Sequence, residues 1–348
     1  MQKHPIGRGG PDVTRFCLGT MTFGTQTGQA DAHAQITMAL EAGLNILDTA
    51  EMYPVNPVSA ETVGLTETII GAWNAANPGR RGEYVLATKV SGEGLKAVRD
   101  GAPISRATIE TAVEASLRRL QTDHIDIYQL HWPNRGSYHF RQNWTFDPSG
   151  QNKSDTLAHI EEVLETVDRL VAAGKVGHIG LSNESAWGTA QWLRVAETHG
   201  LPRVVSVQNE YSMLARLYDT DLAELSVNEE VGLLAFSPLA TGLLTGKYRG
   251  GAVPEGSRMS LNGALGGRVT DRVWGAVDAY AAIAEAHGLD MTHMALAWCA
   301  QRPFMGSVIF GATTRDQLAH ILDGLDLRLS PEVLAEIDAA HRAHPMPF

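Results

Sequence analysis

Eight short apolar runs, each followed by a segment with helical periodicity, recur along the whole sequence. The predicted strands are RFCLGT (15–20), NILDTA (45–50), YVLATKV (84–90), IDIYQLH (125–131), VGHIGLS (176–182), VVSVQNE (204–210), VGLLAFSPL (231–239) and SVIFGAT (307–313). Strands this continuously apolar are typical of parallel sheets that helices cover. Eight units in succession favour an α/β fold of the closed (β/α)8 TIM-barrel type, with an open doubly wound sheet as the alternative.

The segments between the strands predict amphipathic helices. The clearest repeats apolar residues every three to four positions on one face (Ile160, Val163, Leu164, Val167, Leu170 and Val171) and ends at Gly174. A second carries Ile109, Ala112, Val113, Leu117 and Leu120, with two arginines near its C-terminal end. Both patterns place one apolar stripe against the sheet.

The chain is expected to form one domain over residues 1–348. One α/β barrel can reach this length, and no linker rich in Pro, Gly or Ser divides the sequence. The turn-rich start, HPIGRGGPDVT, is expected to cap the bottom of the barrel. Long connections at 132–153 and 247–271 follow the fourth and seventh strands, on the face where barrel enzymes place their functional loops.

Charge and composition exclude several classes of function. The formal charge is −11, so we expect neither nucleic acid nor an anionic membrane as a partner. No apolar run approaches the roughly 18 residues of a membrane span, and the start lacks the apolar core of a signal peptide. Two distant cysteines and 13 histidines match no metal-binding spacing. We therefore expect a cytoplasmic protein without a metal site.

Four ionisable side chains stand at the ends of successive predicted strands. Asp48 and Tyr53 follow the second strand, Lys89 lies near the end of the third, and His131 ends the fourth. The C-terminal ends of barrel strands share one face, so these side chains should converge on one mouth. An acid buried there needs a cationic partner, and Lys89 can keep Asp48 ionised.

This set of groups suits the reduction of a carbonyl. A free phenol has a pKa of about 10, too high for easy proton exchange at neutral pH, and a neighbouring ammonium is expected to lower the pKa of Tyr53. Tyr53 can then give a proton to a carbonyl oxygen while a hydride reaches the carbon. His131 can hydrogen-bond the same oxygen.

Other chemistries fit parts of this pattern. Glu184 and Glu210 leave adjacent strands and could serve as the carboxylate pair of a glycosidase, but that leaves the other four residues unexplained. Lys89 could form a Schiff base, although an acidic partner that keeps it charged disfavours a nucleophilic amine. GLLTGKY (242–248) lacks the spacing of a phosphate-binding P-loop.

The sequence resembles the aldo-keto reductase family over nearly its whole length. The family's tetrad appears as Asp48 and Tyr53 in LDTAEMYP, Lys89 in LATKV and His131 in QLHWP. Within the family it is most similar to a bacterial branch related to the β-subunits of potassium channels. The resemblance implies a nicotinamide cofactor lying extended across the barrel mouth.

The resemblance also implies which residues hold that cofactor. They are Gly19, Thr20, Met21 and Asp48; Ser182, Asn183 and Gln208 around the carboxamide and ring; Phe236, on which the ring stacks; Ser237, Pro238, Leu239 and Thr241 in a diphosphate loop; Lys247 and Arg258 in a basic clasp; and Gly311, Thr313, Arg315 and Gln317. A phosphate on Arg315 would favour NADP(H) over NAD(H). His320 and Ile321 replace the Glu-Asn pair that contacts adenine in the family, and the short C-terminal end predicts no long loop over the pocket.

The predicted function is therefore NAD(P)H-dependent reduction of aldehydes or ketones to alcohols. Met21, Tyr53, Trp132 and the aromatics of 132–153 (Tyr138, Phe140, Trp144 and Phe146) predict an apolar pocket for the small-molecule substrate. The alternative within the same site is an NADP(H)-binding, redox-sensing regulatory subunit with slow turnover.

Overall fold

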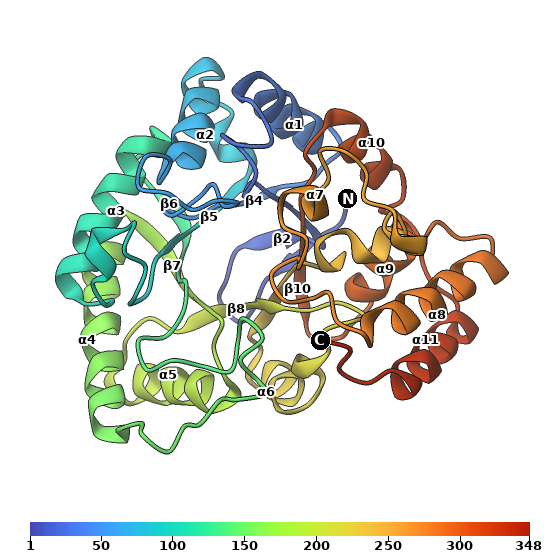
Figure 1. Cartoon of the computed structure of the whole chain (residues 1–348). Helices are drawn as coiled ribbons and strands as arrows, with labels where there is room; N and C mark the ends of the chain where they lie inside the picture. Colours follow the sequence, from blue (N-terminus) through green and yellow to red (C-terminus); the bar gives the residue numbers. More distant parts are fainter.

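Eight parallel strands close into a barrel in the computed structural model, which describes all residues 1–348 (Figure 1). The barrel strands, in spatial order, are β10 (Met305–Phe310), β3 (Phe16–Gly19), β4 (Ile46–Asp48), β5 (Val85–Val90), β6 (Ile125–Leu130), β7 (Val176–Ser182), β8 (Val204–Glu210) and β9 (Gly232–Phe236). The chain is a single-domain (β/α)8 barrel, which confirms the predicted fold. The open doubly wound sheet is wrong, because β10 pairs with both β3 and β9.

Every predicted strand is present, but only β7 and β8 have the predicted ends. β9 stops at Phe236, so Ser237, Pro238 and Leu239 belong to the following loop, and β10 begins at Met305, before the predicted start. Phe236 pairs with Ile309 of β10 and Glu210 of β8. The loop that leaves β9 therefore starts at the C-terminal mouth of the barrel.

Helices surround the barrel as an outer ring (Figure 1). They are α1 (Gln29–Glu41), α2 (Leu65–Ala76), α3 (Arg106–Leu120), α4 (Lys153–Ala172), α5 (Ala186–His199), α6 (Asp221–Glu229), α8 (Val273–Ala286), α9 (Met291–Ala300), α10 (Arg315–Asp323) and α11 (Pro331–Ala343). The short helix α7 (Arg258–Leu261) lies inside this ring (Figure 1). The predicted apolar stripe of α4 is buried except for the half-exposed Val171, and that of α3 is wholly buried. The helices thus bury the outer face of each strand, while the inner faces meet at the barrel axis.

A hairpin closes the N-terminal end of the barrel. It consists of β1 (Lys3–Pro5) paired antiparallel with β2 (Asp12–Thr14). Ile6 and Val13 of this hairpin pack with inward-facing residues of the barrel strands, among them Cys17 and Leu234. The hairpin lies in the segment that was expected to cap the barrel. Apolar side chains fill this end, so the polar side chains of the interior gather at the other end.

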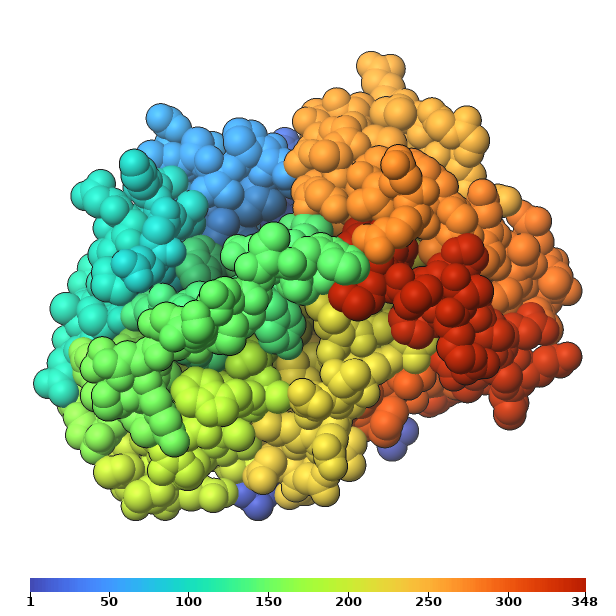
Figure 2. Space-filling view, turned by 60° about the horizontal axis from the view of Figure 1, so that its bottom comes forward, coloured from blue at the N-terminus to red at the C-terminus, as the bar shows by residue number.

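Two long loops meet across the open end of the barrel. The loop at 132–152 joins β6 to α4, and the segment 247–271 includes α7 and leads to α8. The Arg272 guanidinium lies 4.8 Å from the centre of the Trp144 ring. Figure 2 shows the first loop in green, running across the molecule towards the orange and red C-terminal part. No helix combines the length and apolar character that crossing a membrane requires.

Candidate active site

The inward-facing ends of β4 and β5 carry a buried ion pair. The Lys89 ammonium donates to Asp48 Oδ2 and to the Thr49 carbonyl oxygen, both at 2.7 Å. The Lys89 side chain is 0% exposed and that of Asp48 is 4% exposed. At this depth each charge depends on the other, because either one alone would be strongly destabilised.

Two glutamines bind the second oxygen of the same carboxylate. Gln208 on β8 donates to Asp48 Oδ1 at 2.8 Å, and Gln129 on β6 donates to it at 3.2 Å. Gln208 also donates to Gln129 Oε1 at 3.0 Å, which uses both hydrogens of its amide nitrogen. Gln208 was predicted as a cofactor contact; in the structure its N–H groups orient Asp48, and only its carbonyl oxygen is left for a cofactor.

The electrostatics keep Lys89 charged. Burial opposes the ammonium, but attraction to Asp48 and to Tyr53 outweighs it and raises the pKa of Lys89 above its ordinary value. A Schiff-base mechanism needs a neutral amine, so this environment disfavours the aldolase alternative.

Tyr53 and His131 stand beside this ion pair. The Lys89 ammonium lies 5.0 Å from the centre of the Tyr53 ring, and the His131 ring lies 5.8 Å from that ring in an edge-to-face arrangement. Burial, reinforced by repulsion from Lys89, holds the pKa of His131 well below its ordinary value, so the imidazole is neutral. The structure brings all four residues of the predicted tetrad together.

The net shift of the Tyr53 pKa is opposite to the prediction. Lys89 does act to lower it, but burial of the phenol has the larger effect, and the pKa of Tyr53 lies above its ordinary value. The phenol is therefore protonated at neutral pH. The sequence could not show this, because the degree of burial depends on loops that close over the strand ends.

The ends of β7 and β8 offer an unpaired polar atom. Asn183 donates to the His131 carbonyl at 2.9 Å and to Ser182 Oγ at 3.1 Å, whereas its own Oδ1 is buried without a hydrogen-bond partner. Ser182 Oγ in turn donates to the Gln208 carbonyl at 2.8 Å. An amide N–H from a bound molecule would satisfy Asn183 Oδ1, as the predicted carboxamide contact requires.

The loop after β9 has the backbone shape of an anion-binding turn. Ser237 and Thr241 adopt positive φ angles of 54° and 57°, and Gly242 follows at 100°. Turns of this kind can present successive N–H groups to an anion. A side chain at Gly242 would meet the Lys247 ammonium at 3.2 Å, so Lys247 lies directly over this loop.

A second cation, Arg258, lies near the reacting groups. Its side chain forms no ion pair, and burial, together with repulsion from Arg268, lowers its pKa. The positive charge of Arg258 acts to lower the pKa of Tyr53, so Arg258 lies at the same mouth of the barrel. A half-buried guanidinium without an acidic partner is suited to an anionic ligand.

The remaining predicted cofactor residues line the ends of β3 and β10. Thr20 donates to the Asp48 carbonyl at 2.8 Å, and the Met21 carbonyl accepts from the Val55 N–H. A side chain at Gly311 would approach the Gly19 carbonyl at 3.4 Å, so these two glycines lie in contact. Thr313 bonds Gln317 Oε1, while Arg315 is 61% exposed and paired with Asp31.

The aromatic residues of the first long loop divide into two groups. The Trp132 ring lies 5.0 Å from that of His131 and 6.1 Å from that of Phe140. Tyr138 and Phe146 form a separate pair, and Trp144 is 55% exposed. Of these aromatic residues, Trp132 lies against the tetrad through His131.

Both glutamates of the glycosidase alternative are held by arginines. Glu184 pairs with Arg135 of the first long loop. Glu210 accepts from Arg141 of that loop at 3.0 Å and from Arg268 of the second at 2.7 Å. These carboxylates therefore fasten the loops to the barrel, which disfavours the glycosidase alternative.

Sequence reasoning missed two parts of the site. Gln129 could have been found, because it precedes His131 by two residues on the same face of a strand. Glu51 is 3% exposed, accepts from the Ser91 N–H at 2.6 Å and pairs with Arg99 at 2.5 Å. Nothing in the sequence marks Arg99 as its partner, because the pairing joins two loops.

Comparisons with known proteins point to one family. The sequence profile of the Aldo/keto reductase family matches residues 15–342. The chain is 44% identical to "Protein tas" of Escherichia coli, over 100% of this chain and 99% of that protein. It is 32% identical to "Uncharacterized oxidoreductase YrpG" of Bacillus subtilis (94% and 92% covered). It is 30% identical to a "Probable voltage-gated potassium channel subunit beta" of Arabidopsis thaliana (99% and 98%). These matches confirm the predicted family and branch.

Proposed function

The chain belongs to the aldo/keto reductase family and is thus an oxidoreductase of carbonyl compounds, and on that premise we propose that Tyr53 is its general acid. The observation that carries the proposal is the buried Asp48–Lys89 pair, whose ammonium lies 5.0 Å from the Tyr53 ring. The substrate is an aldehyde or ketone, which is reduced to the alcohol. We also propose that the protein works in the cytoplasm.

In the proposed mechanism the chain supplies the proton and holds the carbonyl oxygen. A bound nicotinamide provides the hydride. Tyr53, protonated in its buried setting, donates its phenolic proton to the carbonyl oxygen as negative charge develops there. Neutral His131 hydrogen-bonds the same oxygen and aligns it.

Lys89 and Asp48 act on Tyr53 through charge. The ammonium stabilises the phenolate that forms when Tyr53 gives up its proton. Asp48, fixed by Gln129 and Gln208, keeps that ammonium charged and in place. The buried surroundings strengthen both interactions, since charges interact more strongly where water is excluded.

Several features fit a nicotinamide dinucleotide at this mouth. Asn183 Oδ1 is a buried acceptor without a partner, suited to the carboxamide N–H. The positive-φ loop at Ser237–Gly242, with Lys247 over it, suits a diphosphate. Unpaired Arg258 supplies a further cation for phosphate.

We propose that the preferred cofactor is NADP(H), because Arg258 and Arg315 offer guanidinium groups to a 2′-phosphate. Arg258 has no acidic partner in the structure, whereas Arg315 must leave an exposed ion pair with Asp31. Exposed ion pairs contribute only about 0–1 kcal/mol to stability, so breaking the Arg315–Asp31 pair costs little free energy.

A second candidate function uses the same site. The chain is similar to proteins described as potassium-channel β-subunits, which favours a redox-sensing subunit that binds NADP(H) and turns over slowly. The turnover rate with an aldehyde and ketone panel separates the two functions.

The test of the proposed acid is Tyr53→Phe, which removes only the hydroxyl group. We expect the rate of carbonyl reduction to fall by about 10²–10⁴, while dinucleotide binding, measured by quenching of tryptophan fluorescence, stays nearly unchanged. Tyr84→Phe, outside the mouth, is the matched control and should keep its activity. Turnover of Tyr53→Phe close to that of the wild type would refute the mechanism.

A further inference from the structure

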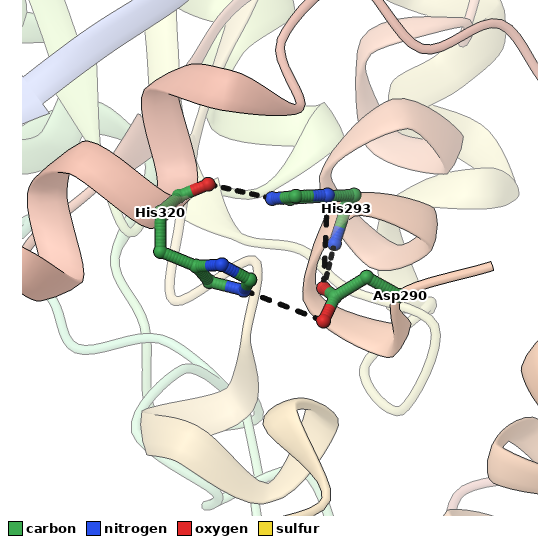
Figure 3. Close-up of side chains that lie close together, drawn as sticks. All are labelled: Asp290, His293 and His320. Carbon is green, nitrogen blue, oxygen red and sulfur yellow. Dashed lines mark hydrogen bonds and ion pairs between the residues drawn. The ribbon is translucent and has the colours of Figure 1, made fainter.

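Three potential metal ligands meet between α9 and α10, away from the tetrad. Asp290 caps the N-terminus of α9, His293 lies in its first turn, and His320 lies near the end of α10. One ligand atom of each lies within 4.8 Å of the others. Figure 3 shows the carboxylate facing both imidazoles. The sequence predicted no metal site, since 26 positions separate His293 from His320 and no motif joins them.

The hydrogen bonds fix which nitrogen of His293 is available. Its Nε2 lies 2.6 Å from the His320 carbonyl oxygen, which can only accept, so Nε2 carries the hydrogen (Figure 3). In the neutral ring Nδ1 is then an unprotonated acceptor, and it faces Asp290 Oδ1 at 3.9 Å. A lone pair facing a carboxylate is unfavourable until a proton or a metal ion lies between them.

Packing holds the His293 ring in this orientation. A side chain at Gly324, just after α10, would approach the ring carbon Cγ at 2.1 Å, so the imidazole lies flat against the Gly324 backbone. The His320 ring stacks on the His293 ring, with the ring centres 4.6 Å apart. The His293 side chain is 17% exposed, against 51% for His320. The least exposed ligand is thus also the one most firmly oriented.

We propose that Asp290, His293 and His320 form a site for a divalent transition-metal ion of the Zn²⁺ class. Two imidazole nitrogens and one carboxylate suit zinc, whereas Mg²⁺ and Ca²⁺ prefer oxygen ligands. Ligands about 2.0 Å from a tetrahedral zinc lie about 3.3 Å from one another. His320 Nε2 and Asp290 Oδ2 are 3.3 Å apart, His293 Nδ1 and Asp290 Oδ1 are 3.9 Å apart, and the three ligand atoms lie within 4.8 Å of one another, so they must move closer together as the ion binds.

The rest of the site also has the features of a metal centre. The bond from His293 Nε2 to a backbone carbonyl is the outer-shell contact that metal-binding histidines usually make. With three protein ligands, solvent completes the coordination of the ion. The ion joins the start of α9 to α10, which also carries the predicted cofactor contacts Arg315 and Gln317.

The test is Zn²⁺ binding to the full-length, untagged protein, measured by calorimetry and by competition with a chromophoric chelator. We expect one Zn²⁺ per chain, visible d–d absorption with Co²⁺ as the probe, and no comparable binding of Mg²⁺. His320→Ala and His293→Ala should each weaken Zn²⁺ binding by more than about tenfold. Both cysteines are buried, so thiols do not compete.

Two further variants separate the site from general histidine binding. His199→Ala removes a half-exposed histidine that has one carboxylate partner, Glu161, and should bind Zn²⁺ like the wild type. Gly324→Ala keeps all three ligands but displaces the His293 ring, and should weaken binding. The proposal is overturned if the wild type does not bind Zn²⁺, or if His320→Ala, confirmed as folded by circular dichroism, binds it as tightly as the wild type.

Discussion

Removing the ammonium of Lys89 tests how the site is built. In Lys89→Met the apolar stem is kept and the charge is lost, so the Asp48 carboxylate stays buried with only Gln129 and Gln208 as donors. Both members of the pair are almost fully buried, at 0% and 4% exposure. Loss of one partner from such a pair costs about 3–5 kcal/mol, because a buried charge is left uncompensated. Reductase activity should be lost as well.

Urea unfolding, followed by tryptophan fluorescence and circular dichroism, measures the loss of stability. The matched control is Lys175→Met, which breaks the pair with Glu114 in which the two side chains are 39% and 46% exposed. It should cost less than about 1 kcal/mol. If Lys89→Met were inactive but no less stable than this control, the Asp48–Lys89 pair would be hydrated and the reasoning wrong.

Three further predictions concern the choice of cofactor, the stability at low pH and the two long loops. NADPH should bind at least about tenfold more tightly than NADH, a difference of about 1.4 kcal/mol, and Arg258→Ala or Arg315→Ala should remove the preference; equal dissociation constants in the wild type would contradict this. His131, whose pKa is lowered by burial, stays neutral when folded, so stability should fall as the pH drops below about 6.5, and the melting temperature of His131→Gln should fall less. Glu210→Gln should weaken the hold on both long loops and speed their proteolysis; cleavage at the wild-type rate would show that the glutamate is dispensable.

The barrel could be predicted because each of its strands and long helices can be recognised within a short stretch of sequence. Each strand is a short apolar run, and each long helix shows its buried stripe within one segment, as in Ile160–Leu170 of α4. The closed barrel was predicted from the number of strand–helix units. The ends were harder: Ser237–Leu239 were assigned to β9, because an apolar run does not show where hydrogen bonding to the neighbouring strands stops.

The tetrad could be predicted for a related reason. Asp48, Lys89 and His131 lie at or next to the ends of their strands, so the topology of the barrel alone brings them together. The charge state of Tyr53 was not accessible in this way. It is a balance between burial, which raises the pKa, and the attraction of Lys89, which lowers it, and the degree of burial depends on packing that the sequence does not show.

The sequence did not predict ion pairs between segments that the barrel topology alone does not bring together. Glu51 meets Arg99, Glu184 meets Arg135, and Glu210 meets Arg141 and Arg268, each across loops whose paths the sequence does not show. In the sequence, Glu184 and Glu210 look like a catalytic carboxylate pair because they leave adjacent predicted strands. In the structure their arginines satisfy them, and these pairs fasten the loops.

The last prediction concerns the effect of these loops on Tyr53. Glu210→Gln should alter the pH at which reduction declines, because loosened loops should let water reach the buried phenol. Since burial raises the pKa of Tyr53, hydration should lower it and move the alkaline loss of activity to lower pH. If faster proteolysis shows that the loops of Glu210→Gln are loosened but its pH–rate profile is unchanged, the loops do not influence the pKa of Tyr53.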